Sequence, residues 1–318
     1  MFLVPDFKGY DFFPHDTRLN FMRFKNVCFF GSLIAIALAL AIISIKGFNF
    51  GVDFKGGALI ELRNTKGPAD LADLRSKLGG LGLGDVQIQS FGTPDDVLVR
   101  VEQQPGGEEA QQTALNKVLD AAGGDYEVRR KEVVGPAVSS ELRITGTIAV
   151  LASILAIVIY VWFRFEWQFA AGAVLALVHD VVVVAGIFSL FQLEFDLGIV
   201  AALLTILGYS VNDTVVVADR IRENLRKYKR MDLTELLNLS INETLSRTIL
   251  TGVTTIAVLL ALYILGGEVI RNFVLAMLLG VVIGTYSSIF IGAPVLEYLN
   301  VRRETVLGPD VKGAQKGT

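Results

Sequence analysis

The sequence has a single cysteine, Cys28, among its 318 residues. It can form no intramolecular disulfide, so any domain outside a membrane must be stable through its own core. Its two histidines, His15 and His179, are too few and too far apart for a typical zinc site. The motifs G-x-x-x-x-G-K-[ST], H-E-x-x-H and G-x-S-x-G are missing. We therefore expect no enzyme activity, no metal and no cofactor, and an ion gradient is the obvious energy source for any work.

A strong charge of one sign is missing too. The net charge is −3 and the basic residues form only short clusters, so nucleic acid is not an expected partner. Hydrophobic residues make up 52% of the chain and the mean hydropathy is +0.53. Because a soluble domain does not average that high, the sequence predicts a membrane protein surrounded by membrane lipids.

Six apolar stretches are long enough to cross a bilayer as helices. Their approximate bounds are 27–45, 144–163, 168–190, 197–218, 248–266 and 273–295. The small residues Ala37 and Ala39 resemble a signal-peptide cleavage site. The basic leader is long, however, and the apolar stretch exceeds that of a typical signal, so we expect an uncleaved anchor. The remaining five spans are predicted to form a bundle over residues 143–299.

The basic residues set the expected orientation, because short loops rich in Lys and Arg stay in the cytoplasm. These residues cluster before the first span, after the fourth and after the sixth, within 1–26, 219–247 and 300–318. We therefore expect both termini and the 219–247 linker to be cytoplasmic. The second half of the linker is amphipathic and is predicted to lie along the inner membrane surface. The domain 46–142 is then on the opposite side of the membrane.

Residues 46–142 carry the charges, glycines and periodicity of a folded α+β domain. Apolar alternation predicts strands at about 57–63, 86–88, 97–101 and 126–134, and helical periodicity predicts helices at about 69–78 and 108–119. The order β-α-β-β-α-β predicts a ferredoxin-like unit, which by itself implies no function and could serve as a spacer or a docking module. The glycine-rich segment 50–57 could be a flexible hinge or a tight turn.

Asp213 interrupts the fourth span and is the most informative residue of the chain. An ionisable side chain at this depth costs about 2.5–3.5 kcal/mol on insertion scales, so it needs a partner, a wet cavity or a proton path. Asn212 lies beside it, on a helical face with Thr205 and Tyr209. Arg247 opens the fifth span and can reach inward through its long side chain. We therefore predict a contact between Asp213 and Arg247 across the hairpin.

Two effects oppose each other at Asp213: the opposite charge favours the ionised form, and loss of water favours the neutral form. Access to water then decides the protonation state. If access alternates between the two sides, the carboxylate can carry a proton and drive a rearrangement of the helices. The alternative is a static ion pair that only fixes helix packing.

Two further features lie in the spans. His179 and Asp180 occupy the middle of the third span, as a second part of a proton relay or as a hydrogen-bonded pair that locks the spans together. In the sixth span small residues repeat every four positions, a pattern that lets another helix approach closely. These residues, which we assign to helix packing, are Gly280, Gly284, Ser288 and Gly292.

Several motifs together resemble the SecF members of the SecD/SecF family, accessory subunits of the bacterial Sec translocase within the RND superfamily. The match runs through nearly the whole chain in order, and the block at 207–224 is the most specific part. The motifs are FGVDFKGG at 50–57, FRFEWQFAAG at 163–172, VHDV at 178–181, LGYSVNDTVVVADRIREN at 207–224, TLSRTILTG at 244–252 and LLGVVIGTYSSIFI at 278–291.

The resemblance implies a multi-pass protein of the bacterial inner membrane, with six helices forming an RND-like half and a periplasmic domain at 46–142. It implies a heterodimer with SecD, work beside the SecYEG channel and SecA on exported polypeptide, and contact with YajC and YidC. It also implies that proton-motive force drives protein export, with the proton-carrying aspartate falling on Asp213 and its basic partner on Arg247. The alternatives are a half-transporter of the RND type that exports a lipid or small amphiphile, and a non-catalytic scaffold for SecD.

Overall fold

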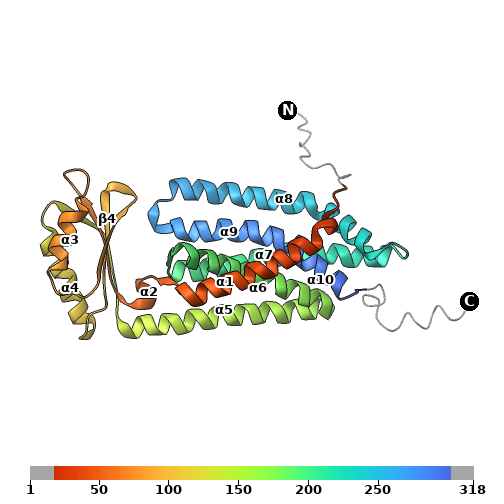
Figure 1. The fold of residues 1–318 in the computed structure, drawn as a ribbon, viewed down its shortest axis with the longest axis horizontal. Coiled ribbons are helices and arrows are strands. Elements are labelled where there is room, and N and C mark those ends of the chain that lie inside the picture. Colours follow the sequence, from red (N-terminus) through yellow and green to blue (C-terminus); the bar gives the residue numbers. More distant parts are fainter. Residues whose placement is uncertain (1–17, 302–318) are drawn as a thin grey trace, which may run out of the picture.

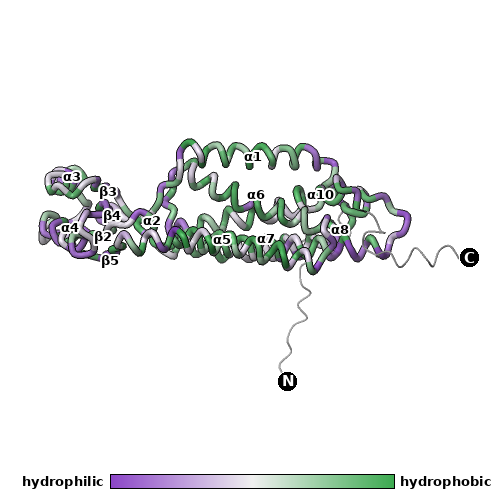
Figure 2. The backbone as a smooth tube through the Cα atoms, turned by 90° about the horizontal axis from the view of Figure 1, so that it is seen from below, coloured by the Kyte–Doolittle hydropathy of each residue, from purple (hydrophilic) through white to green (hydrophobic). Residues whose placement is uncertain are grey.

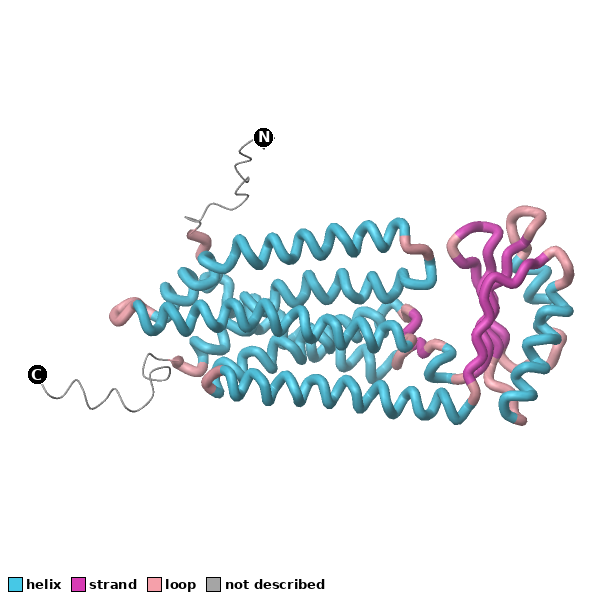
Figure 3. The backbone as a smooth tube through the Cα atoms, turned by 180° about the vertical axis from the view of Figure 1, so that it is seen from behind, coloured by secondary structure: helices cyan, strands magenta, loops and turns pink. Residues whose placement is uncertain are grey.

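The computed structural model describes residues 18–301, and the predicted terminal segments beyond these limits lie outside the described residues. Two regions follow each other along the long axis of the molecule. A bundle of long helices forms one region, and a small α+β domain sits at one end of it (Figure 1). Figure 3 shows the long strands gathered in that domain, away from the helical bundle.

Six helical segments among the described residues are long and apolar enough to span a membrane, which confirms the predicted multi-span class. The sixth starts with a short 3-10 turn, η2, and continues from α9 through the π-helix η3 into α10. The segments are α1 (Lys25–Lys46, preceded by η1, Phe21–Phe24), α5 (Pro136–Arg164), α6 (Trp167–Phe191), α7 (Leu197–Lys227), α8 (Leu233–Leu265), and η2 (Glu268–Ile270), α9 (Arg271–Ser287), η3 (Ser288–Gly292) and α10 (Ala293–Tyr298).

The helices α6, α7 and α9 form the inside of the bundle, whereas α1, α5 and α8 lie at its periphery with most of their apolar surface uncovered. In Figure 2 the residues of α1 and α5 are coloured mostly as hydrophobic, and hydrophilic segments are concentrated toward the two ends of the molecule. Such a surface suits lipid, because acyl chains are as apolar as the side chains that face them.

The cytoplasmic linker expected at 219–247 differs from the observed arrangement. The helix α7 continues to Lys227 and α8 already begins at Leu233, so only a short connection remains. The amphipathic face of the segment, with Leu236, Leu237 and Ile241, packs in one core with Ile221. This face is therefore buried against α7 instead of lying flat on a membrane surface.

The α+β domain contains a four-stranded antiparallel sheet in the order β3-β4-β2-β5. With helices after the first and third of its strands, this is the β-α-β-β-α-β unit that the sequence predicted. A core of apolar residues from the sheet and both helices holds it together. The elements are β2 (Gly57–Asn64), α3 (Leu71–Gly79), β3 (Val86–Phe91), β4 (Thr93–Val101), α4 (Gly107–Ala122) and β5 (Tyr126–Val134).

The glycine-rich segment 50–57 forms a compact turn between α1 and the sheet. Strand β1 (Asn49–Phe50) pairs in parallel with β6 (Glu194–Phe195), which lies between α6 and α7. The short helix α2 (Val52–Lys55) follows, and Phe54 packs on Phe195 with ring centroids 6.2 Å apart. Gly57 has φ +116°, and a Cβ there would lie 2.4 Å from the carbonyl oxygen of Val101. Of the two alternatives, the segment is therefore the tight turn.

Close packing of α9 on α7 depends on Gly280. A Cβ atom at this position would lie 2.2 Å from Cγ1 of Ile206. We expect Gly280→Ala to lower the free energy of unfolding by about 1–3 kcal/mol, because the overpacked helices must move apart. Thermal unfolding of the purified protein in detergent measures this.

Gly31→Ala is the matched control, because nothing lies within 4 Å of a Cβ there. Its stability should stay the same or rise by up to about 1 kcal/mol through helix propensity. Equal destabilisation by both substitutions would contradict the packing role of Gly280.

Candidate functional site

Two carboxylates lie buried in the interior of the helical bundle. Asp180 of α6 is 0% exposed and Asp213 of α7 is 7% exposed. Carboxylates at this depth are costly unless their oxygens find hydrogen-bond partners. The hydrogen bonds of these two groups therefore decide which helices must meet.

Asp213 is held by two hydroxyl groups from two other helical segments. Thr248 Oγ1 of α8 lies 2.7 Å from Oδ1, and Ser288 Oγ at the start of η3 lies 2.9 Å from Oδ2. Both donors are neutral. We call these two hydroxyls the hydroxyl cage of Asp213. A hydroxyl can donate to an ionised carboxylate or accept from a protonated one, so the cage can form hydrogen bonds with Asp213 in either protonation state.

Asp180 has a similar cage of hydroxyl partners nearby in the bundle. Its Oδ2 accepts from Ser210 Oγ of α7 at 2.5 Å and from Ser287 Oγ of α9 at 2.8 Å. Its Oδ1 lies 2.9 Å from Nδ1 of the neighbouring His179. The His179–Asp180 pair is therefore hydrogen-bonded to two other helices. This is the arrangement expected of a pair that holds the spans together.

The two cages share their supporting elements. Ser210 and Asp213 are three residues apart on α7 and so lie on one face of that helix. Ser287 and Ser288 are adjacent where α9 changes into the π-helix η3. Such π-helical turns are frequent at functional sites. Here the change brings two consecutive hydroxyls to two different carboxylates.

The four small residues of the sixth span all lie at helix contacts around these cages. A Cβ at Gly284 would be 3.3 Å from Cβ of Ser210 and 3.5 Å from Oδ2 of Asp180. The carbonyl oxygen of Gly292 would be 2.8 Å from a Cβ at Gly172. Ser288 binds Asp213, and Gly280 faces Ile206. These small residues let α9 and η3 come close enough for the serine hydroxyls to reach the acids.

The predicted direct contact between Asp213 and Arg247 is not present among residues 18–301 of this structure. Thr248 occupies the position next to the carboxylate, and Arg247 is exposed. Successive residues of an α-helix point about 100° apart, so the two neighbours cannot face Asp213 together. Thr251 and Thr254 follow Arg247 on the same face of α8, and their hydroxyls bond to their own helix backbone.

Asn212 also lies away from the cage. It is exposed, as is Thr205 on the same face, whereas the buried face of α7 carries Ile206, Ser210 and Asp213. Sequence reasoning assigned no role to Ser210, Thr248 or Ser287. The signal was available in the spacing: Ser210 and Asp213 share a face with the apolar Ile206 and Val217, which a buried face requires.

A further group of acids lies outside the membrane spans, where the sheet meets the bundle. A cavity of about 270 Å³ there is lined in part by Asp53, Glu61, Glu194 and Asp196. Glu194 of β6 pairs with Arg100 of β4. Burial raises the pKa of the Glu194 carboxyl, and the Arg100 guanidinium opposes this rise. The pair gives the α+β domain a polar contact with the bundle besides its two chain connections.

The sequence of this chain matches known protein families over most of its length. The family described as "Protein export membrane protein SecD/SecF, C-terminal" matches residues 114–302. The "SecD/SecF GG Motif" matches residues 41–63, which include the tight turn after α1. The chain belongs to the SecD/SecF family, as a SecF subunit. This confirms the resemblance that the motifs carried.

Separate SecF proteins match along almost their whole length. The "Protein translocase subunit SecF" of Rickettsia rickettsii is 46% identical over 290 residues, covering 89% of this chain and 92% of the relative. The SecF of Vibrio alginolyticus is 44% identical, covering 93% and 95%. The "Protein translocase subunit SecDF" of Brucella abortus is 44% identical over 94% of this chain, but the chain spans only 39% of that longer protein.

Solved SecDF structures share the fold. A crystal structure of SecDF from Thermus thermophilus, described as a translocon-associated membrane protein, aligns with 90% of this chain at a TM-score of 0.80 and 38% identity. A SecDF structure in a super-membrane-facing form aligns with 95% at a TM-score of 0.67. The chain covers 39% and 40% of these longer SecDF chains, so it aligns with only part of each of them.

The hydroxyl cage of this SecF chain gives a direct stability prediction. We expect Thr248→Val to lower the free energy of unfolding by about 1–3 kcal/mol, because it keeps the shape but leaves a buried carboxylate oxygen without its donor. Thermal unfolding in detergent measures the change.

Thr251→Val makes the same chemical change three residues along α8. The Thr251 hydroxyl is exposed and bonds to the backbone of its own helix, so its loss should change stability by less than about 0.5 kcal/mol. If the two valine variants were equally stable, Thr248 would not hold Asp213 as described.

Proposed function

We propose that this SecF subunit couples proton-motive force to protein export through the SecYEG channel, with Asp213 as the carboxylate that takes up and releases the proton. The observation that carries the proposal is the cage itself. A buried acid held only by neutral hydroxyls has satisfied oxygens both with and without its proton. Neither protonation state therefore leaves a buried carboxyl oxygen without a hydrogen-bond partner.

Protonation changes what the cage holds. Ionised Asp213 accepts from Thr248 and Ser288, whereas a protonated carboxyl must donate one bond and so reverses a hydroxyl. Because these hydroxyls sit on α8 and η3, the change acts on two helical segments at once. A transmembrane potential supplies about 2.3 kcal/mol per charge per 100 mV, which is enough to shift a two-state equilibrium by tens-fold.

Arg247 is the proposed charge partner of Asp213 in a second arrangement of the helices. It lies next to Thr248, so a rotation of α8 by about one residue, some 100°, would exchange the two side chains in front of the carboxylate. An arginine there favours the ionised acid, and a threonine tolerates both forms. Exchange of these neighbours is a way to link proton release to helix movement.

A second subunit, SecD, is the proposed partner that completes the membrane part. The exposed faces of α7 and α8 carry polar side chains, among them Asn212, Arg247 and Thr251, which would be unfavourable against lipid. Tyr209 Oη lies 3.8 Å from a Cβ built on Gly252, so the two faces adjoin. The match to fused SecDF proteins, which are longer than this chain, supports a SecD half in this place.

The proposed orientation puts both termini in the cytoplasm and the α+β domain in the periplasm of the bacterial inner membrane. Lys25 opens α1, and Arg226 and Lys227 lie in the last turn of α7. Both of these helix ends are at the end of the bundle away from the α+β domain (Figure 1). Cytoplasmic segments of membrane proteins are enriched in such residues, which supports this orientation. In it, the α+β domain faces the exported polypeptide.

Asp213→Asn tests the proton role, because the amide resembles the protonated acid and cannot ionise. We expect SecF with this substitution to assemble with SecD, and the export stimulated by an imposed proton gradient to fall to the level without a gradient. Secretion into inverted membrane vesicles, with and without the gradient, is the measurement. Glu235→Gln is the control, since it also replaces a carboxylate by an amide but at an exposed position in the first turn of α8, and it should export normally.

Normal gradient-dependent export by Asp213→Asn would favour the scaffold role instead. Accumulation of a lipid in the inner leaflet, with protein secretion untouched, would favour a half-transporter of a lipid or small amphiphile. The three outcomes are distinct in the same vesicle preparation.

A double-mutant cycle tests the partnership of Asp213 with Arg247. If Arg247 acts through Asp213, Arg247→Gln reduces gradient-dependent export on its own but removes nothing further when Asp213 is already asparagine. Lys229→Gln, which removes an exposed charge in the connection between α7 and α8, is the control. Independent, additive losses at Asp213 and Arg247 would contradict the pairing.

A further inference from the structure

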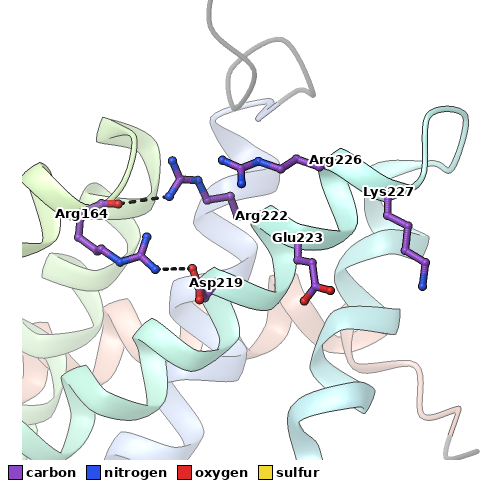
Figure 4. A pocket seen from close by; sticks show the side chains of 6 residues that line it. All are labelled: Arg164, Asp219, Arg222, Glu223, Arg226 and Lys227. Atoms are coloured by element: carbon purple, nitrogen blue, oxygen red, sulfur yellow. Dashed lines mark hydrogen bonds and ion pairs between the residues drawn. The ribbon is translucent and has the colours of Figure 1, made fainter.

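A basic pocket lies at the end of the bundle that is remote from the α+β domain. Its volume is about 670 Å³, and it is formed where α5 ends beside the last turns of α7 (Figure 4). Four basic and two acidic side chains line it: Arg164, Arg222, Arg226, Lys227, Asp219 and Glu223. The lining therefore has a positive net charge, and neither of the buried carboxylates belongs to it.

Three arginines share one side of this pocket. Arg222 and Arg226 are four residues apart on α7 and so lie on the same face of the helix. Figure 4 shows their guanidinium groups next to each other and toward α5, whereas Glu223 and Lys227 point to the other side. Arg222 Nη1 lies 3.4 Å from the backbone oxygen of Arg164. The head groups of Arg222 and Arg226 therefore lie next to each other beside the end of α5.

Residues of the protein provide hydrogen-bond acceptors for only some of the N–H groups of these arginines. Arg164 pairs with Asp219 at 2.8 Å and Arg222 with Glu166 at 3.0 Å. Within residues 18–301 the Arg226 side chain has no hydrogen bond or ion pair, and the buried Nε of Arg222 has no acceptor. Like charges four residues apart on a helix repel each other. An anion bound between them would remove this repulsion and supply the missing acceptors.

Exposed aromatic residues place the pocket at headgroup depth. Trp162 and Trp167 are 67% and 59% exposed and flank Arg164 at the end of α5 and the start of α6. Tryptophans concentrate where lipid headgroups meet the acyl chains. Along α5, Leu151, Leu155 and Ile159 are also exposed, at intervals of four residues. An apolar track therefore runs from the middle of the membrane to the basic pocket.

We propose that this pocket binds the phosphate headgroup of an anionic phospholipid. Arg164, Arg222 and Arg226 donate hydrogen bonds to the phosphate oxygens, a geometry that the planar guanidinium group favours. The acyl chains lie on the exposed face of α5. Basic pockets beside transmembrane helices commonly bind such headgroups. The site depends neither on proton transfer at Asp213 nor on the export activity.

The experiment is native mass spectrometry of the full chain released from detergent with added lipid. Wild type is titrated with phosphatidylglycerol and, separately, with zwitterionic phosphatidylcholine. The variants are Arg226→Gln and Arg222→Gln/Arg226→Gln. The matched control, Lys229→Gln/Arg230→Gln, removes the same charge three and four residues beyond Arg226, outside the pocket lining. Arg226→Gln alone keeps the test informative if the double variant unfolds, because its loss breaks no side-chain hydrogen bond or ion pair within residues 18–301.

We expect wild type to retain phosphatidylglycerol in preference to phosphatidylcholine. Each arginine removed from the pocket should weaken this binding on the order of fivefold, and the control should bind as wild type does. Equal weakening in the control, or unchanged binding in Arg226→Gln, would overturn the proposal. Inorganic phosphate that displaces the lipid at millimolar concentration would show that the pocket takes free phosphate and would also overturn the lipid assignment.

Discussion

Removal of water from two carboxylates is the constraint on which the membrane part of this protein depends. Asp180 and Asp213 lie in an apolar interior, where an oxygen without a donor is far more costly than it is in water. Their donors come from α7, α8, α9 and η3. The cages therefore fix how these helices pack, and a change in the hydrogen bonds of either acid acts on several helices at once. Stability and the proposed mechanism share the same atoms.

The small residues of the sixth span serve the same end. Helices in a membrane gain little from hydrophobic attraction to each other, so close approach and hydrogen bonds hold them. Gly280 and Gly284 allow the approach, and Ser287 and Ser288 then reach the acids because the helix changes to a π-turn between α9 and α10. Packing and polar contacts are thus parts of one arrangement.

The ends of the bundle differ in what they contact. One end meets the α+β domain through the tight turn at 50–57, the β1–β6 pair and the Arg100–Glu194 ion pair. These contacts tie the domain to the loop between α6 and α7, next to the start of the helix that carries Asp213. The other end carries the arginines of the basic pocket and two exposed tryptophans. A movement of α7 would therefore shift residues at both ends of the bundle.

Sequence alone determined the six spans, the α+β order and the family, because hydrophobic length, strand alternation and motif spacing are local properties of the chain. It also singled out Asp180 and Asp213, since an acid in an apolar run stands out wherever its helix packs. Only the tertiary structure decided the partners. Arg247 and Thr248 are adjacent in sequence, and which of them faces Asp213 depends on the rotation of α8 against α7. That rotation is set by contacts between residues far apart in the chain, which no single helical pattern contains.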